Sequence, residues 1–534
     1  MERSNVSRSP QPRGSEMLHG RKLAALAALA ISVVLIIGCT PAEVGNEFHS
    51  EIHRLMDQER YRNASWNLTM VELGSGNPAE LIRPDAYFLP GSTAKLFSAG
   101  AALEEFGAQS RVTTPIYATA KPSGGKLSGD LVLVASGDMN LGGRSAGAAQ
   151  IEYSDFDHNE ANVLPRATLT AGDPLSGLDS LASQVRDSGV TAVEGDVLID
   201  DRLFTPYDKW NDGVISPIML NDNLIDLTIT PTAAGSVAAA SQRPFVSGYA
   251  IDSNITTGPA GGPATVSIHR RADGRIEATG TVPAGSEPVI RTFKVEDPSS
   301  FARSALIDAL RRAGISLTAQ PGPANPSGSL PAANSYTDAN RLAALDSATL
   351  AEEIKVILKV SFNRGADLLI CRLAVAGGSK DCLDGMTRMQ QILDKAGIDK
   401  TALYLFDGAG SSDHTRTSPV AFIKWLEFAK QRPWSSAFVD ALPIMGVDGS
   451  LADVERNGAS MGKVRAKTGT RATSTPTGEA LLYAKSLAGY LEGKSGRTYL
   501  LVIAVNGVPI SGIEEIIAVV DDLGAMASAL QQAN

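Results

Sequence analysis

The sequence contains few of the side chains that bind transition metals, with three cysteines and six histidines among 534 residues. Cys371 and Cys382 have no histidine nearby, and no His-Glu-x-x-His motif occurs. We therefore expect no metal site. The sequence also lacks an excess of positive charge, because its formal net charge is −10. Neither nucleic acid nor an anionic surface is expected as a partner.

The N-terminal segment is predicted to be a targeting signal rather than part of the fold. Basic residues precede an apolar run at 23–37, which is too short for a comfortable membrane span and typical of a secretory signal over residues 1–38. The run ends Leu-Ile-Ile-Gly-Cys-Thr, which resembles the bacterial lipoprotein processing site and implies a lipid on Cys39. An uncleaved anchor or a plain signal peptide is the alternative. In each case the body of the protein is expected to act outside the cytoplasm, lipid-anchored to the membrane if Cys39 is modified.

The other two cysteines leave two interpretations open. A compartment outside the cytoplasm permits a disulfide between Cys371 and Cys382, and Gly377 and Gly378 between them can turn the chain. Two buried free thiols are the alternative.

The strongest chemical pattern lies between Pro90 and Gly107. Apolar residues recur there at spacings of three and four, which predicts a helix that Gly107 ends. Ser92 and Lys95 are three residues apart, so their side chains share one face. An alcohol becomes a nucleophile when a base takes its proton, and lysine is such a base where its neutral form is favoured. The free N–H groups of a helix start favour a neutral amine and stabilise an oxyanion.

The Ser-x-x-Lys spacing alone does not identify a catalytic pair. It also occurs at Ser123/Lys126, in a turn, and at Ser460/Lys463. Further motifs are needed to decide.

Two later motifs complete a set. Ser361 and Asn363 flank a phenylalanine where a helix could end or bend, an arrangement that would point both polar side chains into one cleft. Lys467, Thr468 and Gly469 lie on a predicted strand. The lysine and threonine could hold a carboxylate, and the glycine would let a substrate backbone approach.

Taken together, the three motifs resemble the signatures of penicillin-recognising serine peptidases and serine β-lactamases. The long gap between the first two motifs is unlike β-lactamases. It is similar to the D-alanyl-D-alanine carboxypeptidase/endopeptidase family of low-molecular-mass penicillin-binding proteins, which carry inserted domains there. The resemblance extends to the runs at 135–138, 195–200, 407–412 and 442–451. It implies hydrolysis of peptidoglycan stem peptides or cross-links, covalent inhibition by β-lactams, and no cofactor.

The resemblance also implies roles in acylation. Ser92 would be the acylated nucleophile and Lys95 its general base. Ser361 and Asn363 would relay protons and orient the substrate amide.

Substrate binding is implied for the third motif. Lys467 and Thr468, beside Gly469, would bind the terminal carboxylate, and the N–H groups of Thr470 and of the nucleophile would form the oxyanion hole. One departure lies next to them, because a Thr/Pro/Gly-rich stretch at 471–479 is predicted to be an inserted loop. It leaves the side-chain preference of the site open.

The implied fold is α+β. A transpeptidase-like domain of helices and an antiparallel sheet is predicted for 39–125 and 336–534. A β-rich insertion is predicted for 126–335, with a small β domain nested at about 230–295. The patterns further predict strands at 65–73, 86–89, 463–470, 480–491 and 498–505, a long helical pattern at 349–373, and a helix after 510.

Three other readings compete with this one. Gly458-Ala-Ser460-Met-Gly462 matches the nucleophile elbow of α/β-hydrolases, but no histidine follows it and His414 is interpreted as a loop residue. A non-catalytic, lipid-anchored peptidoglycan receptor and a β-lactamase or esterase on the same scaffold are the others. Asp200 and Asp201 either contact a substrate side chain or form a strand-ending turn.

Overall fold

The computed structural model describes residues 46–145, 150–163, 166–209 and 212–534. The predicted signal segment and Cys39 lie outside these residues. No helix among the described residues combines the length and the apolar composition that crossing a membrane requires.

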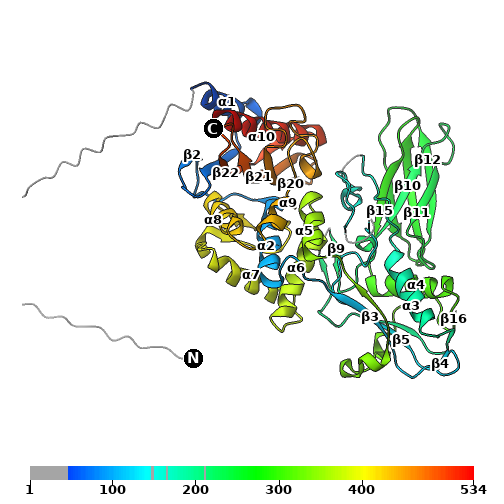
Figure 1. Cartoon of the computed structure of the whole chain (residues 1–534). Coiled ribbons are helices and arrows are strands. Elements are labelled where there is room, and N and C mark those ends of the chain that lie inside the picture. Colours follow the sequence, from blue (N-terminus) through cyan, green and yellow to red (C-terminus); the bar gives the residue numbers. More distant parts are fainter. Residues whose placement is uncertain (1–45, 146–149, 164–165, 210–211) are drawn as a thin grey trace, which may run out of the picture. The chain divides into compact units, whose positions relative to one another are not determined.

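An antiparallel sheet is built from the two ends of the described chain (Figure 1). Its strand order is β2-β1-β22-β21-β20, and β23 pairs with β21. This confirms the predicted C-terminal strands. The strands are β1 (Ser65–Glu72), β2 (Pro78–Ile82), β20 (Val464–Ser474), β21 (Ala480–Glu492), β22 (Thr498–Asn506) and β23 (Val508–Ile510).

Helices bury both faces of this sheet. On one face α1 (Asn46–Met56) and α10 (Ile513–Ala533) pack around an apolar core that includes Leu487. On the other face α8 (Pro419–Lys430) and α2 (Lys95–Phe106) pack around a core that includes Val502 and Trp425. The Trp425 indole donates to the carbonyl of Leu96 at 2.8 Å, which fixes α2 against α8.

The predicted catalytic helix has two parts. A 3-10 turn, η2 (Gly91–Ala94), leads into α2, and Gly107 ends the helix with a φ of +79°. Glycine adopts this left-handed conformation without a side-chain clash, as the pattern predicted.

The helical pattern at 349–373 is interrupted. It forms α5 (Leu350–Lys359) and α6 (Asn363–Ala376), because Ser361 has a φ of +62° and cannot continue a helix. Phe362 is buried at the break, and its N–H reaches the carbonyl of Ile357. A disulfide joins Cys371 on α6 to Cys382, just before α7 (Asp384–Lys395).

Two local predictions were wrong. The second N-terminal strand is β2 rather than 86–89, where Phe88 makes only an isolated bridge to Thr417 and the N–H of Leu89 donates to the Asn506 side chain. The predicted loop at 471–479 is wrong in its bounds, because β20 continues to Ser474 past a bulge and pairs with the start of β21, which leaves 475–479 as the connection.

The insertion has its own layers and its own core (Figure 1). A sheet in the order β17-β3-β5-β7 packs against α3 (Ser176–Asp187) and α4 (Pro298–Arg312). The predicted limits of the insertion, 126 and 335, fall between strands of this sheet, and the domain limits stay a prediction. The strands are β3 (Thr113–Ala118), β5 (Leu131–Val134), β7 (Val197–Asp200) and β17 (Arg341–Asp346).

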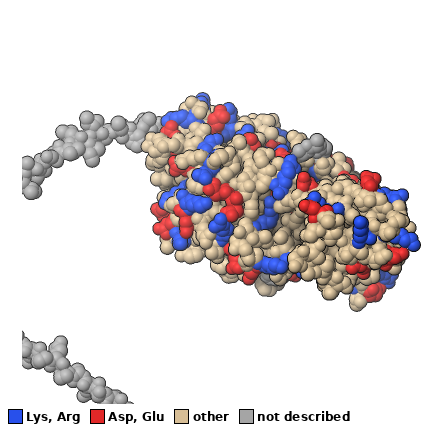
Figure 2. Space-filling model, turned by 60° about the horizontal axis from the view of Figure 1, so that its bottom comes forward, with Lys and Arg blue, Asp and Glu red and all other residues tan. Residues whose placement is uncertain are grey.

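Two small sheets cover about the same residues as the predicted nested β domain, and they share a separate apolar cluster. A hairpin around 272–274 joins β13 to β14 in antiparallel register. The strands are β10 (Leu224–Thr230), β11 (Ala239–Arg243) and β15 (Val289–Lys294) in one sheet, and β12 (Ile251–Gly258), β13 (Ser267–Arg270) and β14 (Ile276–Pro283) in the other. Figure 2 shows basic and acidic side chains interspersed over the face it draws.

Candidate active site

The first two motifs meet at Lys95. Its Nζ lies 2.8 Å from Ser92 Oγ and 2.6 Å from Asn363 Oδ1, and it also donates to the carbonyl of Ala409 at 3.0 Å. Lys95 is fully buried. Ser92 comes from η2 and Asn363 from the first turn of α6, so the break between α5 and α6 places the second motif beside the first.

Burial sets the basicity of this amine. Removal from water disfavours the ammonium and lowers the pKa of Lys95 to about 8, although the carboxylates of Asp212 and Asp367 partly offset the effect. A lysine with this pKa holds a useful neutral fraction near neutral pH. The amine can therefore accept a proton from the hydroxyl 2.8 Å away.

The third motif lies on β20, the edge strand beside η2. Lys467 is fully buried, and burial together with the charges of Lys95 and Lys485 holds the pKa of Lys467 well below its usual range. The Thr468 hydroxyl lies 2.7 Å from that of Ser450.

Gly469 serves the packing of the chain itself. A Cβ at this position would lie 2.1 Å from the carbonyl oxygen of Pro90. The glycine thus lets β20 approach the segment that carries Ser92, whereas the sequence had suggested close approach by a substrate backbone.

Ser361 differs from Asn363 in its contacts. The Asn363 amide bonds to Lys95, whereas the Ser361 hydroxyl makes no hydrogen bond to the residues that the structure describes. Both residues flank buried Phe362, which anchors the break.

One residue from the insertion, Asp212, contacts the second motif, and sequence reasoning missed it. Asn363 Nδ2 donates to Asp212 Oδ1 at 3.1 Å, and Arg364 donates to the backbone carbonyl of Asp212 at 2.8 Å. Asp212 lies in the turn between β8 (Tyr207–Lys209) and β9 (Gly213–Ile215). Because it is far from Asn363 in sequence, no motif spacing indicates the contact.

Lys485 is a second missed neighbour. It lies on β21 directly opposite Thr470 and donates to the Thr470 hydroxyl at 2.7 Å. Burial lowers the pKa of Lys485 to about 8, and the carboxylate of Asp521 partly offsets the effect. Among the described residues, no carboxylate forms an ion pair with Lys485. A lone lysine in a strand gives no sequence signal of this kind.

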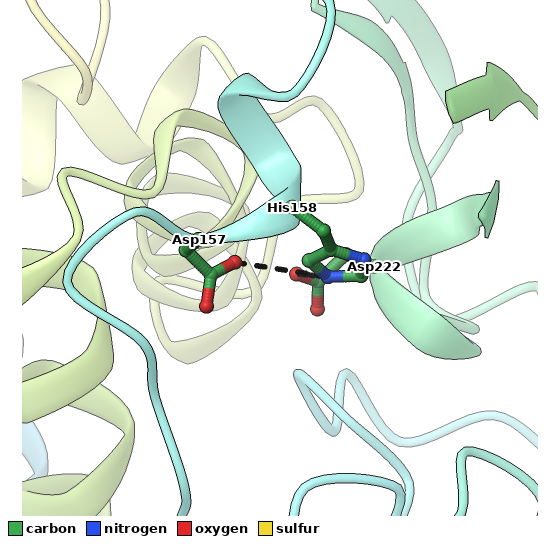
Figure 3. Close-up of side chains that lie close together, drawn as sticks. All are labelled: Asp157, His158 and Asp222. Carbon is green, nitrogen blue, oxygen red and sulfur yellow. Dashed lines mark hydrogen bonds and ion pairs between the residues drawn. The ribbon is translucent and has the colours of Figure 1, made fainter. Parts of the chain in front are cut away.

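Asp157, His158 and Asp222 are close enough to hold a cation (Figure 3). The charges of the two carboxylates are already compensated by Arg144, which binds Asp157 through two hydrogen bonds of 2.8 Å and also contacts Asp222. Burial by itself would lower the pKa of His158, but Asp226 and Asp222 raise it to about 10. A protonated histidine is not a metal ligand, so we interpret the cluster as a buried ion network.

The remaining candidates have ordinary structural partners. Asp200 is buried and accepts hydrogen bonds from Arg202 and Tyr336, and Asp201 accepts one from Ser299 at 2.6 Å. The Ser460 hydroxyl is buried and lies 2.6 Å from that of Ser528. These contacts favour structural roles for all three residues.

Comparisons with known proteins agree on one family and one fold. The family described as D-Ala-D-Ala carboxypeptidase 3 (S13) matches residues 49–526. A D-alanyl-D-alanine carboxypeptidase of Actinomadura sp. (strain R39) is 27% identical over 93% of this chain and 89% of its own length. DacB of Haemophilus influenzae is 23% identical over 80% of this chain and 82% of its own.

A solved structure from Haemophilus influenzae also matches this fold. The crystal structure of penicillin binding protein 4 (dacB) from Haemophilus influenzae matches with a TM-score of 0.68 and 19% identity, covering 90% of this chain and 99% of that one. The likeness confirms the predicted fold class, with helices, an antiparallel sheet and β-rich inserted parts.

Proposed function

The chain belongs to the S13 family of D-Ala-D-Ala carboxypeptidases, and from this premise we propose that Ser92 is its acylated nucleophile and Lys95 the general base. The family makes the protein a serine-type hydrolase that acts on cell-wall peptides outside the cytoplasm. The observation that carries the residue assignment is the position of Lys95 Nζ, within hydrogen-bond distance of both Ser92 and Asn363.

The reaction follows from this contact. Neutral Lys95 takes the hydroxyl proton, Ser92 Oγ attacks the carbonyl carbon of the penultimate D-Ala, and the peptide C–N bond breaks. The terminal D-Ala leaves with a proton on its nitrogen. Water then attacks the ester on Ser92, which releases the shortened peptide and returns the proton to the serine. Asn363, bonded to Lys95, holds the amine in line and orients the substrate amide.

We propose that β20 binds the negatively charged groups of the substrate. We assign the terminal carboxylate to Lys467 and Thr468, and the oxyanion of the tetrahedral intermediate to the N–H groups of Ser92 and Thr470. The close packing of Gly469 on Pro90 supports this assignment, because it holds β20 and the nucleophile in fixed relation. Ser361 would relay a proton once substrate fills the site.

Finer features remain part of the proposal. They are D,D-endopeptidase activity on cross-links, covalent inhibition by penicillin at Ser92, and attachment to the membrane by a lipid on Cys39 after removal of a signal peptide. Fold likeness to a penicillin-binding protein and the signal-like sequence of the N-terminus support them.

Release of D-alanine from a D-Ala-D-Ala peptide tests the proposal. The protein should release it, Ser92→Ala should abolish release, and penicillin should be hydrolysed far more slowly than the peptide. Circular dichroism and thermal melting of the variant control for folding. A Ser92→Ala protein that kept peptidase activity would refute the mechanism. A folded wild type that released nothing would favour the receptor reading, and rapid penicillin turnover would favour a β-lactamase.

A further inference from the structure

Four aromatic side chains form an exposed row beside the site, which we name the aromatic ridge: Tyr87, Tyr404, Phe406 and His414. The exposed fractions of Tyr87, Tyr404 and Phe406 are 47%, 48% and 53%. The rings of Tyr87 and Tyr404 meet edge to face with centroids 5.8 Å apart, and those of Phe406 and His414 lie 5.7 Å apart. Tyr404 and Phe406 alternate with less exposed neighbours in an extended segment, so they share one side.

The ridge is attached at three places to the segments that carry the motif residues. Tyr87 lies five positions before Ser92. Phe406 lies three positions before Ala409, whose carbonyl accepts from Lys95. The chain at these spacings spans at most about 18 Å, which limits how far the backbone of Tyr87 lies from Ser92 and that of Phe406 from Ala409.

The third attachment runs through an ion pair. His414 follows Asp413, which binds Arg471 at 2.6 Å, and Arg471 follows Thr470 on β20. The ridge is therefore linked, through the chain and this ion pair, to the segments that carry the motif residues. Contiguous exposed aromatic groups on a soluble protein mark binding surfaces.

The distance between Ser92 and the ridge can be compared with the length of the stem peptide. A stem peptide of about four residues between the cleaved bond and the sugar spans at most roughly 14 Å. The sugar that carries the peptide thus begins at a distance from Ser92 that the ridge can reach. A sugar ring has apolar C–H faces and polar edges, and the rings of tyrosine and histidine likewise combine an apolar face with a polar group.

We propose that the aromatic ridge binds the glycan strand to which the stem peptide is attached. The proposal rests on the proposed function, since it needs a peptide in the cleft. It makes the enzyme select polymeric peptidoglycan over free peptide through contacts outside the cleft. The Tyr87 hydroxyl donates to the carbonyl of Thr401, which orders one ring before the glycan binds.

The test compares two substrates with one pair of variants. Tyr404→Ser/Phe406→Ser removes two rings, and Phe245→Ser removes an aromatic ring that is 63% exposed on the insertion. We expect the double variant to lose at least about fivefold in kcat/KM on purified peptidoglycan and to keep its kcat/KM on a short D-Ala-D-Ala peptide. The Phe245→Ser protein should match the wild type on both.

The other outcomes are distinct. If the double variant and the wild type had equal kcat/KM on peptidoglycan, the proposal that the ridge binds the glycan strand would be overturned. So would parallel losses on both substrates in a folded protein, because they would indicate a distorted cleft. A wild type that dimerises and a double variant that is monomeric would assign the ridge to a second copy of the chain instead. Failure of every protein, including wild type, on the short peptide would refute the proposed function itself.

Discussion

Replacing Asp212 by asparagine should make acylation faster at acidic pH. The neutral form of Lys95 is the proposed base, and Asp212 is the carboxylate that most favours the charged form. Removing that negative charge lowers the pKa of Lys95, so more of the amine is neutral below pH 8. The substitution keeps the size of the side chain, and the asparagine oxygen can still accept the hydrogen bond from Asn363.

The size of the effect follows from the geometry. The Asn363 amide bridges the two groups through contacts of 2.6 Å to Lys95 and 3.1 Å to Asp212. Charges about 8 Å apart interact by roughly 2 kcal/mol at an effective dielectric constant near 20. Because one pKa unit corresponds to about 1.4 kcal/mol, we expect the acid limb of the acylation profile to move by roughly 1.5 pH units toward lower pH.

The assay is the second-order rate of acylation by a fluorescent penicillin from pH 5.5 to 9.5. For the wild type the rate should rise about tenfold per pH unit and level off near pH 8, the pKa of buried Lys95. The Asp212→Asn protein should exceed the wild type at pH 6 and approach it at pH 9. Asp413→Asn is the matched control, because Asp413 pairs with Arg471 and should leave the limb in place.

An unmoved limb in the Asp212→Asn protein would refute this account of the base. It would point instead to Lys485, whose pKa burial also lowers to about 8 and on which Asp521 acts. A shift toward higher pH would contradict the sign of the electrostatic argument.

Three further predictions concern buried groups. Lys485→Met should lower the acylation rate by about tenfold, because the Thr470 hydroxyl loses its hydrogen-bond donor and a nearby positive charge. Lys485→Arg should restore part of the rate. Equal rates in Lys485→Met and wild type would contradict this prediction. Arg144→Met should reduce the free energy of unfolding by about 3–5 kcal/mol in urea titrations, because the buried carboxylates of Asp157 and Asp222 lose Arg144 and keep only His158 as a cationic partner. A loss below about 1 kcal/mol would argue against the ion network. Reducing the bond between Cys371 and Cys382 should cost roughly 2–3 kcal/mol of stability, as expected for a loop of 11 residues, measured by melting with and without reductant.

Local patterns indicated that Ser92 and Lys95 lie side by side, because both belong to one helical turn. Ser92 and Lys95 are three residues apart, and the sequence shows their shared face directly. The C-terminal strands were predictable for a similar reason, since apolar runs bounded by turn residues indicate strands before any partner is known.

Predictions were less complete where tertiary contacts decided the backbone. The helical pattern at 349–373 divides into two helices at left-handed Ser361 and buried Phe362, where the sequence indicated that a helix could end or bend. The pattern at 86–89 predicts a strand, but the hydrogen bonds of this segment go to Thr417 and to the Asn506 side chain.

Contacts from distant segments left no sequence signal. Asp212 comes from the insertion and Lys485 from a neighbouring strand, and their partners are set by folding rather than by spacing. The charges that tune Lys95 therefore became visible only in three dimensions.

The most direct test of the central claim is intact-protein mass spectrometry after incubation with penicillin, followed by peptide mapping. The account predicts one covalent adduct of the mass of the penicillin, located on Ser92 and absent from Ser92→Ala. An adduct on another serine, such as Ser361 or Ser460, would contradict the assignment of the nucleophile. No adduct on protein shown to be folded would contradict the acyl-enzyme mechanism.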